Sequence, residues 1–130
     1  IEGIFGLNAA VRYLLNIGMA NINAYEEELK RYAVSELEKT GNATIYNAKS
    51  EAGIVAFNIK DVFAQDAATF LNSRGIACRS GQHCAKILID YLGVVATVRA
   101  SFYFYTTKED IDALVDAVKH GKEFLDAYFN

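Results

Sequence analysis

The clearest structural signal in this chain is the stretch VRASFYFY at residues 98–105. Its side chains alternate between two faces, as they do in a β-strand that is covered on one side. The first face holds Val98, Ala100, Phe102 and Phe104, and the second holds Arg99, Ser101, Tyr103 and Tyr105. We therefore predict a strand over 98–105 that buries its first face and places Arg99 on the other.

A helix is predicted on the C-terminal side of this strand. Thr107, with Asp110 three residues later, has the pattern of a capping box, in which two side chains bond the free N–H groups at a helix start. His120 falls in the polar part of this helix and is interpreted as a surface residue. The apolar side of the helix consists of Ile111, Leu114, Val115, Val118, Phe124 and Leu125.

The preceding part of the chain predicts alternating helices and strands. Apolar residues at helical spacing predict one helix that ends at Gly18 and another over 22–39. Short apolar runs predict strands over 44–48, 53–59 and 76–79. A helix capped by Asp61 is predicted through Ser73, and a short helix over 86–93. The predicted buried face of the 61–73 helix consists of Val62, Phe63, Ala67, Phe70 and Leu71.

This order of elements predicts an α+β fold. We expect a two-layer α/β sandwich, with helices packed on a three- to four-stranded sheet that is mostly antiparallel or mixed. The 130 residues fit a single domain over 1–130. The net charge of −3 and the lack of a basic block argue against a nucleic-acid surface. No apolar run approaches the roughly 18 residues of a membrane span.

Cysteine usage points to a reducing, cytoplasmic setting. The two cysteines are too few for a disulfide framework or a cysteine-only zinc site, and the two histidines lie far apart, so no metal site is predicted. No leader of the signal-peptide kind is recognised. The chain begins at Ile1 and not at Met, with a helical pattern almost at once. We therefore expect a piece of a longer chain.

The main candidate for chemistry is Cys84, in the loop RSGQHCA at residues 79–85. We expect it where this loop becomes a helix, with Arg79 and His83 close by in sequence. A helix N-terminus and neighbouring cations both favour the reactive thiolate. The alternative is a small apolar residue buried at a helix start, because free cysteine packs well in cores.

Four other side chains have two interpretations each. Arg99 is either a solvent-exposed residue or a fork for a substrate carboxylate, and Arg79 has the same ambiguity. His83 is either an acid or base for the thiol or a surface loop residue. Cys78 is interpreted as a structural core thiol, although a disulfide with Cys84 stays possible at this point.

Two segments of the chain stand out together: GIACRSGQHCA at residues 75–85 and VRASFYFYTT at residues 98–107. In order and spacing they resemble the C-terminal domain of group II cysteine desulfurases, the Suf-system enzymes of the class V aminotransferase family. The resemblance covers almost the whole chain. It implies the small domain of a fold-type I pyridoxal-phosphate (PLP) enzyme. Such an enzyme converts L-cysteine to L-alanine and holds the sulfur as a persulfide on its own cysteine, for iron–sulfur cluster or other sulfur biosynthesis.

The resemblance also implies roles for individual residues. Cys84 matches the nucleophile that attacks the substrate sulfur, Arg99 matches the arginine that grips the substrate carboxylate, and Arg79 matches an arginine beside the active-site loop. Gln82 stands where the family often has a histidine, which leaves proton transfer at that position open. His83 is then assigned to proton transfer or to support of the loop.

The lysine that binds PLP in this family lies in a Ser-x-x-Lys or Ser-x-His-Lys pattern, and the sequence has no match to it. The resemblance therefore implies that the chain is inactive alone and binds no PLP by itself. Its partners would be the large PLP-binding domain of the same protein, a second copy in a homodimer, and a sulfur acceptor of the Suf type. Two alternatives stay open: a selenocysteine lyase or another class V relative, and a stand-alone persulfide carrier or interaction module.

Overall fold

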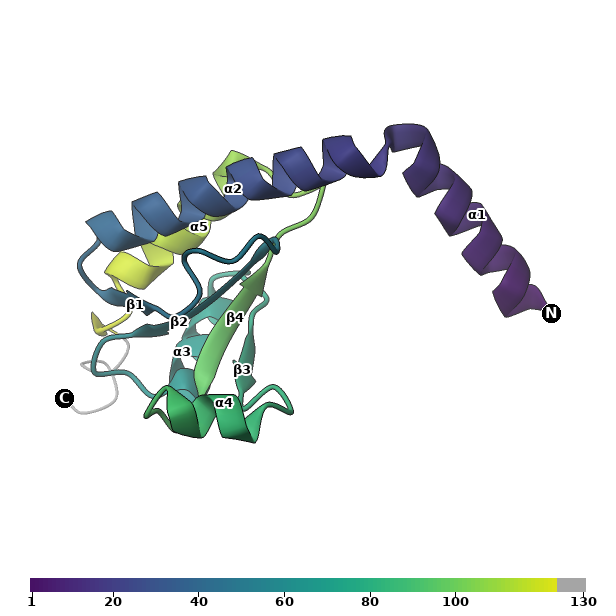
Figure 1. Ribbon diagram of the computed structural model, residues 1–130. Coiled ribbons are helices and arrows are strands. Elements are labelled where there is room, and N and C mark those ends of the chain that lie inside the picture. Colours follow the sequence, from purple (N-terminus) through teal and green to yellow (C-terminus); the bar gives the residue numbers. More distant parts are fainter. Residues whose placement is uncertain (124–130) are drawn as a thin grey trace.

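The computed structural model describes residues 1–123. Helices pack on one open sheet, and α1 projects away from the rest (Figure 1). The elements in order are α1 (Glu2–Ile17), α2 (Met19–Lys39), β1 (Ala43–Ile45), β2 (Ile54–Ile59), α3 (Ala64–Ser73), β3 (Arg79–Gly81), α4 (Lys86–Tyr91), β4 (Thr97–Ser101) and α5 (Lys108–Lys119).

The sheet has four strands in the order β1-β2-β4-β3. All three neighbouring pairs are antiparallel. Because β1 pairs with β2 while β4 lies between β2 and β3, the sheet joins the middle of the chain to its C-terminal part. The predicted α+β fold with a three- to four-stranded, mostly antiparallel sheet is confirmed.

One face of the sheet carries the hydrophobic core. Val55 and Phe57 of β2 pair with Ala100 and Val98 of β4, so these four side chains share a face. Helices α2, α3 and α5 all contribute to the same buried cluster, so they form the second layer on that face. The helical members of the core are Leu29, Ala33, Leu37, Ala64, Ala67, Phe70, Leu71, Ile111, Leu114, Val115, Ala117 and Val118.

The start of α5 has the predicted capping box. The Thr107 hydroxyl accepts a hydrogen bond from the Asp110 N–H, and the Asp110 carboxylate accepts one from the Thr107 N–H. The helix then buries Ile111, Leu114, Val115 and Val118 as predicted. The predicted core positions Phe124 and Leu125 lie outside the described residues.

All four strands differ from their predicted bounds. β1 covers Ala43–Ile45 where 44–48 was predicted, and β2 covers Ile54–Ile59 where 53–59 was predicted. β4 ends at Ser101, although the Phe102 N–H still bonds the carbonyl of Gly53 and Phe102 is buried as predicted. The chain then turns, with the Thr106 N–H donating to the carbonyl of Tyr103. β3 begins at Arg79 and not at residue 76. The Ile76 N–H still bonds the carbonyl of Leu71 at the end of α3, so this part of the chain closes the helix instead of joining the sheet.

The predicted start of α3 is wrong. The helix begins at Ala64, and its N-cap position is Phe63, which provides no side-chain bond. Asp61 adopts a left-handed backbone, φ 65°, and its carboxylate pairs with Lys122 at 2.8 Å. Phe63 is 50% exposed, so it does not belong to the buried face of this helix.

Helix α1 has little contact with the rest of the molecule. It joins α2 at Gly18, whose φ of 92° favours glycine, and it has no buried residue. The predicted end of the first helix at Gly18 is confirmed. Apolar side chains are exposed along α1, among them Ile4, Phe5 and Leu7. Within the described residues, no helix is long and apolar enough to cross a membrane.

Candidate functional site

Strands β3 and β4 place two arginines directly opposite each other. Arg79 pairs with Arg99 in antiparallel register, and paired side chains project from the same face of a sheet with Cβ atoms about 5 Å apart. The next residue across the sheet is Ala56, which pairs with Arg99 from the other side. This is the face that α2, α3 and α5 do not cover. We call it the arginine face.

Arg99 is more buried than an ordinary surface arginine. Its side chain is half-buried, and its Nε is buried without a hydrogen-bond partner in residues 1–123. Neither Arg99 nor Arg79 forms an ion pair with any described residue. A buried guanidinium N–H without an acceptor is costly, so the arrangement favours a bound anion over a purely structural role. A planar fork of this kind suits a carboxylate.

His83 lies on the same face, above Thr97. Thr97 and Arg99 are two residues apart on β4, so their side chains project to the same side. The Nε2 atom of His83 lies 3.1 Å from the carbonyl oxygen of Thr97 and 3.1 Å from its hydroxyl oxygen. Thr97 is only 2% exposed. The analysis of the sequence did not single out Thr97; its spacing of two from Arg99 was the available signal.

Cys84 lies in a tight turn and not at the first residue of a helix. Its φ is 59° and that of His83 is 55°, and the Ala85 N–H bonds the carbonyl of Gln82. Helix α4 begins two residues later, at Lys86, and has six residues. The helix begins at Lys86 as predicted, and Cys84 lies in the turn just before it, with its thiol exposed.

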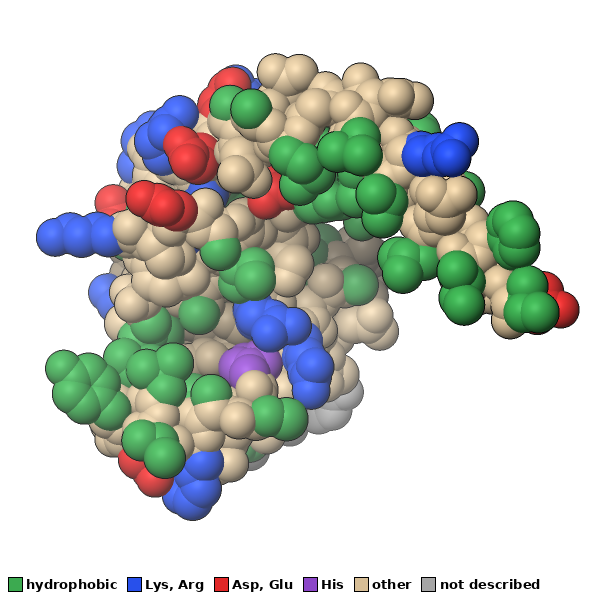
Figure 2. Space-filling view, turned by 45° about the vertical axis from the view of Figure 1, so that its right-hand side comes forward, with side chains coloured by type: hydrophobic (Ala, Val, Ile, Leu, Met, Phe, Trp, Pro, Cys, Tyr) green, Lys and Arg blue, Asp and Glu red, His purple; other side chains and the backbone are tan. Residues whose placement is uncertain are grey.

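The surface beside Cys84 is apolar. Cys84 borders a shallow depression lined by Ala85, Ile87, Leu88 and Tyr91, together with the charged Lys86. Ile87 is 87% exposed and Tyr91 is 86% exposed. Figure 2 shows hydrophobic side chains gathered in the region of α4, with a histidine and basic side chains beside them. The turn thus separates a charged face from an apolar one.

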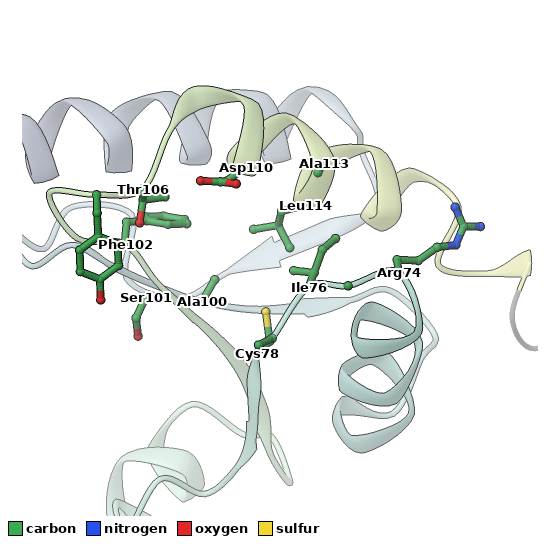
Figure 3. Close-up of a pocket in the computed structure, with 13 residues that line it drawn as sticks. Arg74, Ile76, Cys78, Ala100, Ser101, Phe102, Thr106, Asp110, Ala113 and Leu114 are labelled. Atoms are coloured by element: carbon green, nitrogen blue, oxygen red, sulfur yellow. The ribbon is translucent and has the colours of Figure 1, made fainter.

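Cys78 occupies a different environment. It is half-buried, packs against the core and is a free thiol, as is Cys84. Burial raises its pKa to about 11. Its sulfur points into a cavity of about 340 Å³ between the sheet and α5 (Figure 3). The interpretation of Cys78 as a structural core thiol agrees with this position, and the disulfide that the sequence left open is not formed.

The structure brings four of the predicted residues together: Arg79, Arg99, His83 and Cys84 all belong to the arginine face or to the turn at its edge. His120 lies apart from them. It ends α5, and its Nδ1 is 2.8 Å from the carbonyl oxygen of Asp116. In the part of the chain that the structure describes, no group of three or more His, Cys, Asp or Glu side chains could hold a metal ion.

A lysine that binds PLP has to be an enclosed amine that can lose its proton. Lys86 is close to Cys84 in sequence, but its side chain is exposed and its ammonium pairs with Asp90 at 3.0 Å. Lys30 is buried, and this burial lowers its pKa, but its Nζ donates to Ser50 in the loop between β1 and β2. Neither lysine is placed to hold the cofactor beside Cys84, so these residues do not fit a complete PLP site.

Known proteins are similar to this chain in sequence. The family described as aminotransferase class-V matches residues 1–114. A protein of Halalkalibacterium halodurans named probable cysteine desulfurase is 46% identical over 129 residues, which make up 99% of this chain and 32% of that protein. A protein of Staphylococcus aureus with the same name is 44% identical over 131 residues, with 99% and 32% covered. The chain thus spans about a third of the length of these curated relatives.

Solved structures share its fold. The cysteine desulfurase CsdA (S-sulfonic acid) from Escherichia coli superposes with a TM-score of 0.86 at 36% identity, covering 93% of this chain and 30% of that one. The apo cysteine desulfurase from Thermococcus onnurineus NA1 superposes with a TM-score of 0.84 at 33% identity, covering 88% and 29%.

Proposed function

This chain belongs to the class V aminotransferase family, and from that membership we propose that it is the C-terminal domain of a PLP-dependent cysteine desulfurase. Its relatives with the highest identities quoted above carry that name, and the two solved structures described are cysteine desulfurases. The observation that carries the proposal is the position of the Arg79–Arg99 pair beside the turn that exposes Cys84.

The proposed reaction transfers one sulfur atom from L-cysteine to Cys84. The carbon–sulfur bond of the substrate breaks, a sulfur–sulfur bond forms on Cys84, and the products are L-alanine and the Cys84 persulfide. The substrate carbon gains the hydrogen that the two thiols release, so no external oxidant or reductant is needed. The thiolate is the attacking form of a cysteine. An exposed turn suits a sulfur that is passed on to another protein.

Arg99 is proposed to bind the substrate carboxylate. Its Nε–H is buried without an acceptor, so a carboxylate oxygen would satisfy a donor that the folded chain leaves unpaired. Arg79 lies directly opposite and adds a second positive charge for the same anion. We assign Arg79 to substrate binding together with Arg99, and we assign the nucleophile to Cys84.

The PLP lysine is proposed to lie in a part of the protein beyond this chain. PLP, when bound, activates the carbon–sulfur bond of the substrate. The relatives are about three times as long as this chain, and α1 exposes apolar side chains such as Ile4 and Phe5, which a large domain would cover. We further propose two partners for the complete protein, a second copy in a homodimer and a sulfur acceptor of the Suf type. We also propose a reducing, cytoplasmic setting, because a persulfide forms on a free thiol.

The test uses this chain alone and the complete protein, meaning this chain joined to the part that its relatives have beyond it. With PLP and L-cysteine, we expect alanine and a Cys84 persulfide from the complete protein and neither from the chain alone. Cys84→Ser should abolish the persulfide. Turnover by the chain alone would show that the cofactor lysine is not missing from it, and competition with selenocysteine distinguishes a selenocysteine lyase.

Arg99→Ala in the complete protein tests substrate binding. A charged hydrogen bond is worth roughly 1.5–3 kcal/mol, so we expect KM for L-cysteine to rise by about 10- to 100-fold. Arg74→Ala is the matched control, because Arg74 is an exposed arginine that stacks on Phe70 at 5.2 Å. An unchanged KM and kcat for Arg99→Ala would remove Arg99 from the site.

A further inference from the structure

The turn that presents Cys84 has an unfavourable backbone. His83 and Cys84 are consecutive residues with φ of 55° and 59°. Within residues 1–123, Asp61 is the one other residue besides glycine with a positive φ. The left-handed region is costly for residues with a Cβ, and such residues persist where the surrounding structure holds them. Some contact therefore has to hold this turn.

The contact between His83 and Thr97 meets that need. The Nε2 atom of His83 lies 3.1 Å from both the carbonyl and the hydroxyl oxygen of Thr97. A carbonyl oxygen only accepts hydrogen bonds, so Nε2 carries the hydrogen and donates it. Nδ1 is buried without a partner in the described residues. The ring is thus held through one nitrogen alone.

Thr97 is a rigid anchor for this contact. It is 2% exposed, lies in the strand between β2 and β3, and pairs with Gly81, the last residue of β3. The chain is therefore fixed at Gly81, where the turn begins. On the other side, Ile89 of α4 is buried at 3% exposure. Between these two fixed points, the His83 contact is the side-chain bond that the turn makes to the sheet.

We propose that Thr97 is a positioning residue: by holding His83, it fixes the left-handed turn that presents the Cys84 thiol at the edge of the arginine face. The consequence for sulfur transfer rests on the proposed function, whereas the contact itself does not. Thr97 touches no reacting atom. It acts on Cys84 through the backbone of His83, so its removal should slow formation of the persulfide without weakening binding of the substrate.

The first test compares Thr97→Val with Thr97→Ser in the complete protein. Valine keeps the shape and the backbone carbonyl but removes the hydroxyl, while serine keeps it. A single hydrogen bond corresponds to a change of about threefold to tenfold, so we expect kcat for persulfide formation to fall by that factor in Thr97→Val. KM for L-cysteine should stay within about twofold, and Thr97→Ser should restore kcat. Equal rates in the two variants would overturn the proposal.

The second test separates the contact from the backbone strain and from ring chemistry. His83→Gln can place an amide N–H near the position of Nε2, whereas His83→Asn tolerates a left-handed backbone but is too short to reach Thr97. We expect His83→Gln to keep the rate within about threefold and His83→Asn to lose about tenfold. A full rate in His83→Asn would show that the contact is dispensable. Equal losses in both would assign chemistry to the ring and overturn the positioning role.

A third measurement does not depend on sulfur chemistry. In the chain labelled with nitrogen-15, the Nε2 atom of His83 should carry a hydrogen, and backbone shifts at Cys84 should report a left-handed conformation that Thr97→Val weakens. If the complete protein forms no persulfide while these signals appear as expected, the proposed function fails and the anchoring of the turn stands. If the Cys84 shifts are the same in Thr97→Val, the anchoring is overturned.

Discussion

Alkylation should distinguish the two cysteines of this chain. Burial raises the pKa of Cys78 from its ordinary value of 9.0 to about 11, and the thiolate is the form that reacts. At pH 8, the thiolate fraction of Cys78 therefore falls by about a hundredfold. A thiolate of higher pKa is intrinsically more nucleophilic, with a Brønsted slope of about 0.4–0.5, which raises the rate of the ionised form by about a factor of ten. The raised pKa thus slows alkylation of Cys78 by about tenfold relative to a thiol of ordinary pKa.

Shielding adds to this difference. Cys78 is half-buried and its sulfur faces a pocket beside α5, whereas Cys84 is exposed on its turn. We therefore expect iodoacetamide to modify Cys84 at least about tenfold faster than Cys78 at pH 8. The rates are measured by mass spectrometry in the single-cysteine variants Cys78→Ala and Cys84→Ala. Unfolding in urea is the control, because it should bring the two rates close together.

The same pKa shift predicts a loss of stability at alkaline pH. The unfolded chain releases the Cys78 proton near pH 9, while the folded chain keeps it until about pH 11, so the free energy of unfolding falls as pH rises through this interval. Because the shift is about two pKa units, the free energy of unfolding falls by at most about 2.7 kcal/mol. Urea titrations at pH 8 and 9.5 should show this decline, and Cys78→Ala should remove it.

The alkylation experiment has its own refuting result. Faster alkylation of Cys78 than of Cys84 in the folded chain would refute the assignment of the two thiols.

Two further substitutions test the packing around the site. Thr107→Ala removes the hydroxyl that accepts from the Asp110 N–H in the α5 capping box and should lower the free energy of unfolding by about 1 kcal/mol. Ser35→Ala, exposed on α2, is the control and should change it by less than about 0.5 kcal/mol. Gly53→Ala would place a Cβ 2.8 Å from the backbone oxygen of Phe102, so β2 and the end of β4 have to shift, at a cost of about 1–3 kcal/mol. Gly6→Ala meets nothing within 4 Å and should not destabilise the chain.

The central part of β4 could be predicted from the sequence because its signal is local. Val98, Ala100 and Arg99 alternate with the two-residue period of a strand, and the structure buries the first two and leaves the third on the open face. The end of the strand could not be predicted in this way. Phe102 keeps the alternation and is buried as predicted, but the chain turns after it, where the Thr106 N–H bonds the carbonyl of Tyr103. The alternation of side chains does not show where the backbone turns.

The starts of α5 and α3 differ in the same way: one depends on neighbouring residues and the other on a residue far away in the sequence. Thr107 caps α5 with Asp110, three residues away, so its role is visible in sequence. Asp61 has the right residue type for an N-cap but pairs with Lys122 instead. An ion pair across 61 positions competes with the local cap, and only the folded arrangement decides between them.

Part of the candidate site could be predicted from the sequence for the same reason. Cys84 and Arg99 stood out by type and by position, but the direct pairing of Arg79 with Arg99 depends on the register of two strands. Thr97 was missed because its contact with His83 joins positions 14 residues apart. The start of α4 at Lys86 agrees with the prediction, but the left-handed backbone of His83 and Cys84 was not predicted, because the residue types of this loop do not fix its backbone angles.

The Arg79–Arg99 pair is the feature that stability alone does not explain. Like charges directly opposite on a sheet destabilise it, and in residues 1–123 no carboxylate pairs with either guanidinium. The buried Nε of Arg99 adds an unpaired donor. A sequence under selection for folding alone would replace one arginine by a neutral residue, because local conflicts of this kind are concentrated at functional sites.

An anion on the arginine face removes both costs at once, by neutralising the pair and by accepting a hydrogen bond from Nε of Arg99. The substrate carboxylate would thus stabilise the sheet that binds it, so L-alanine at high concentration should protect the complete protein from unfolding, and Arg99→Ala should abolish this protection.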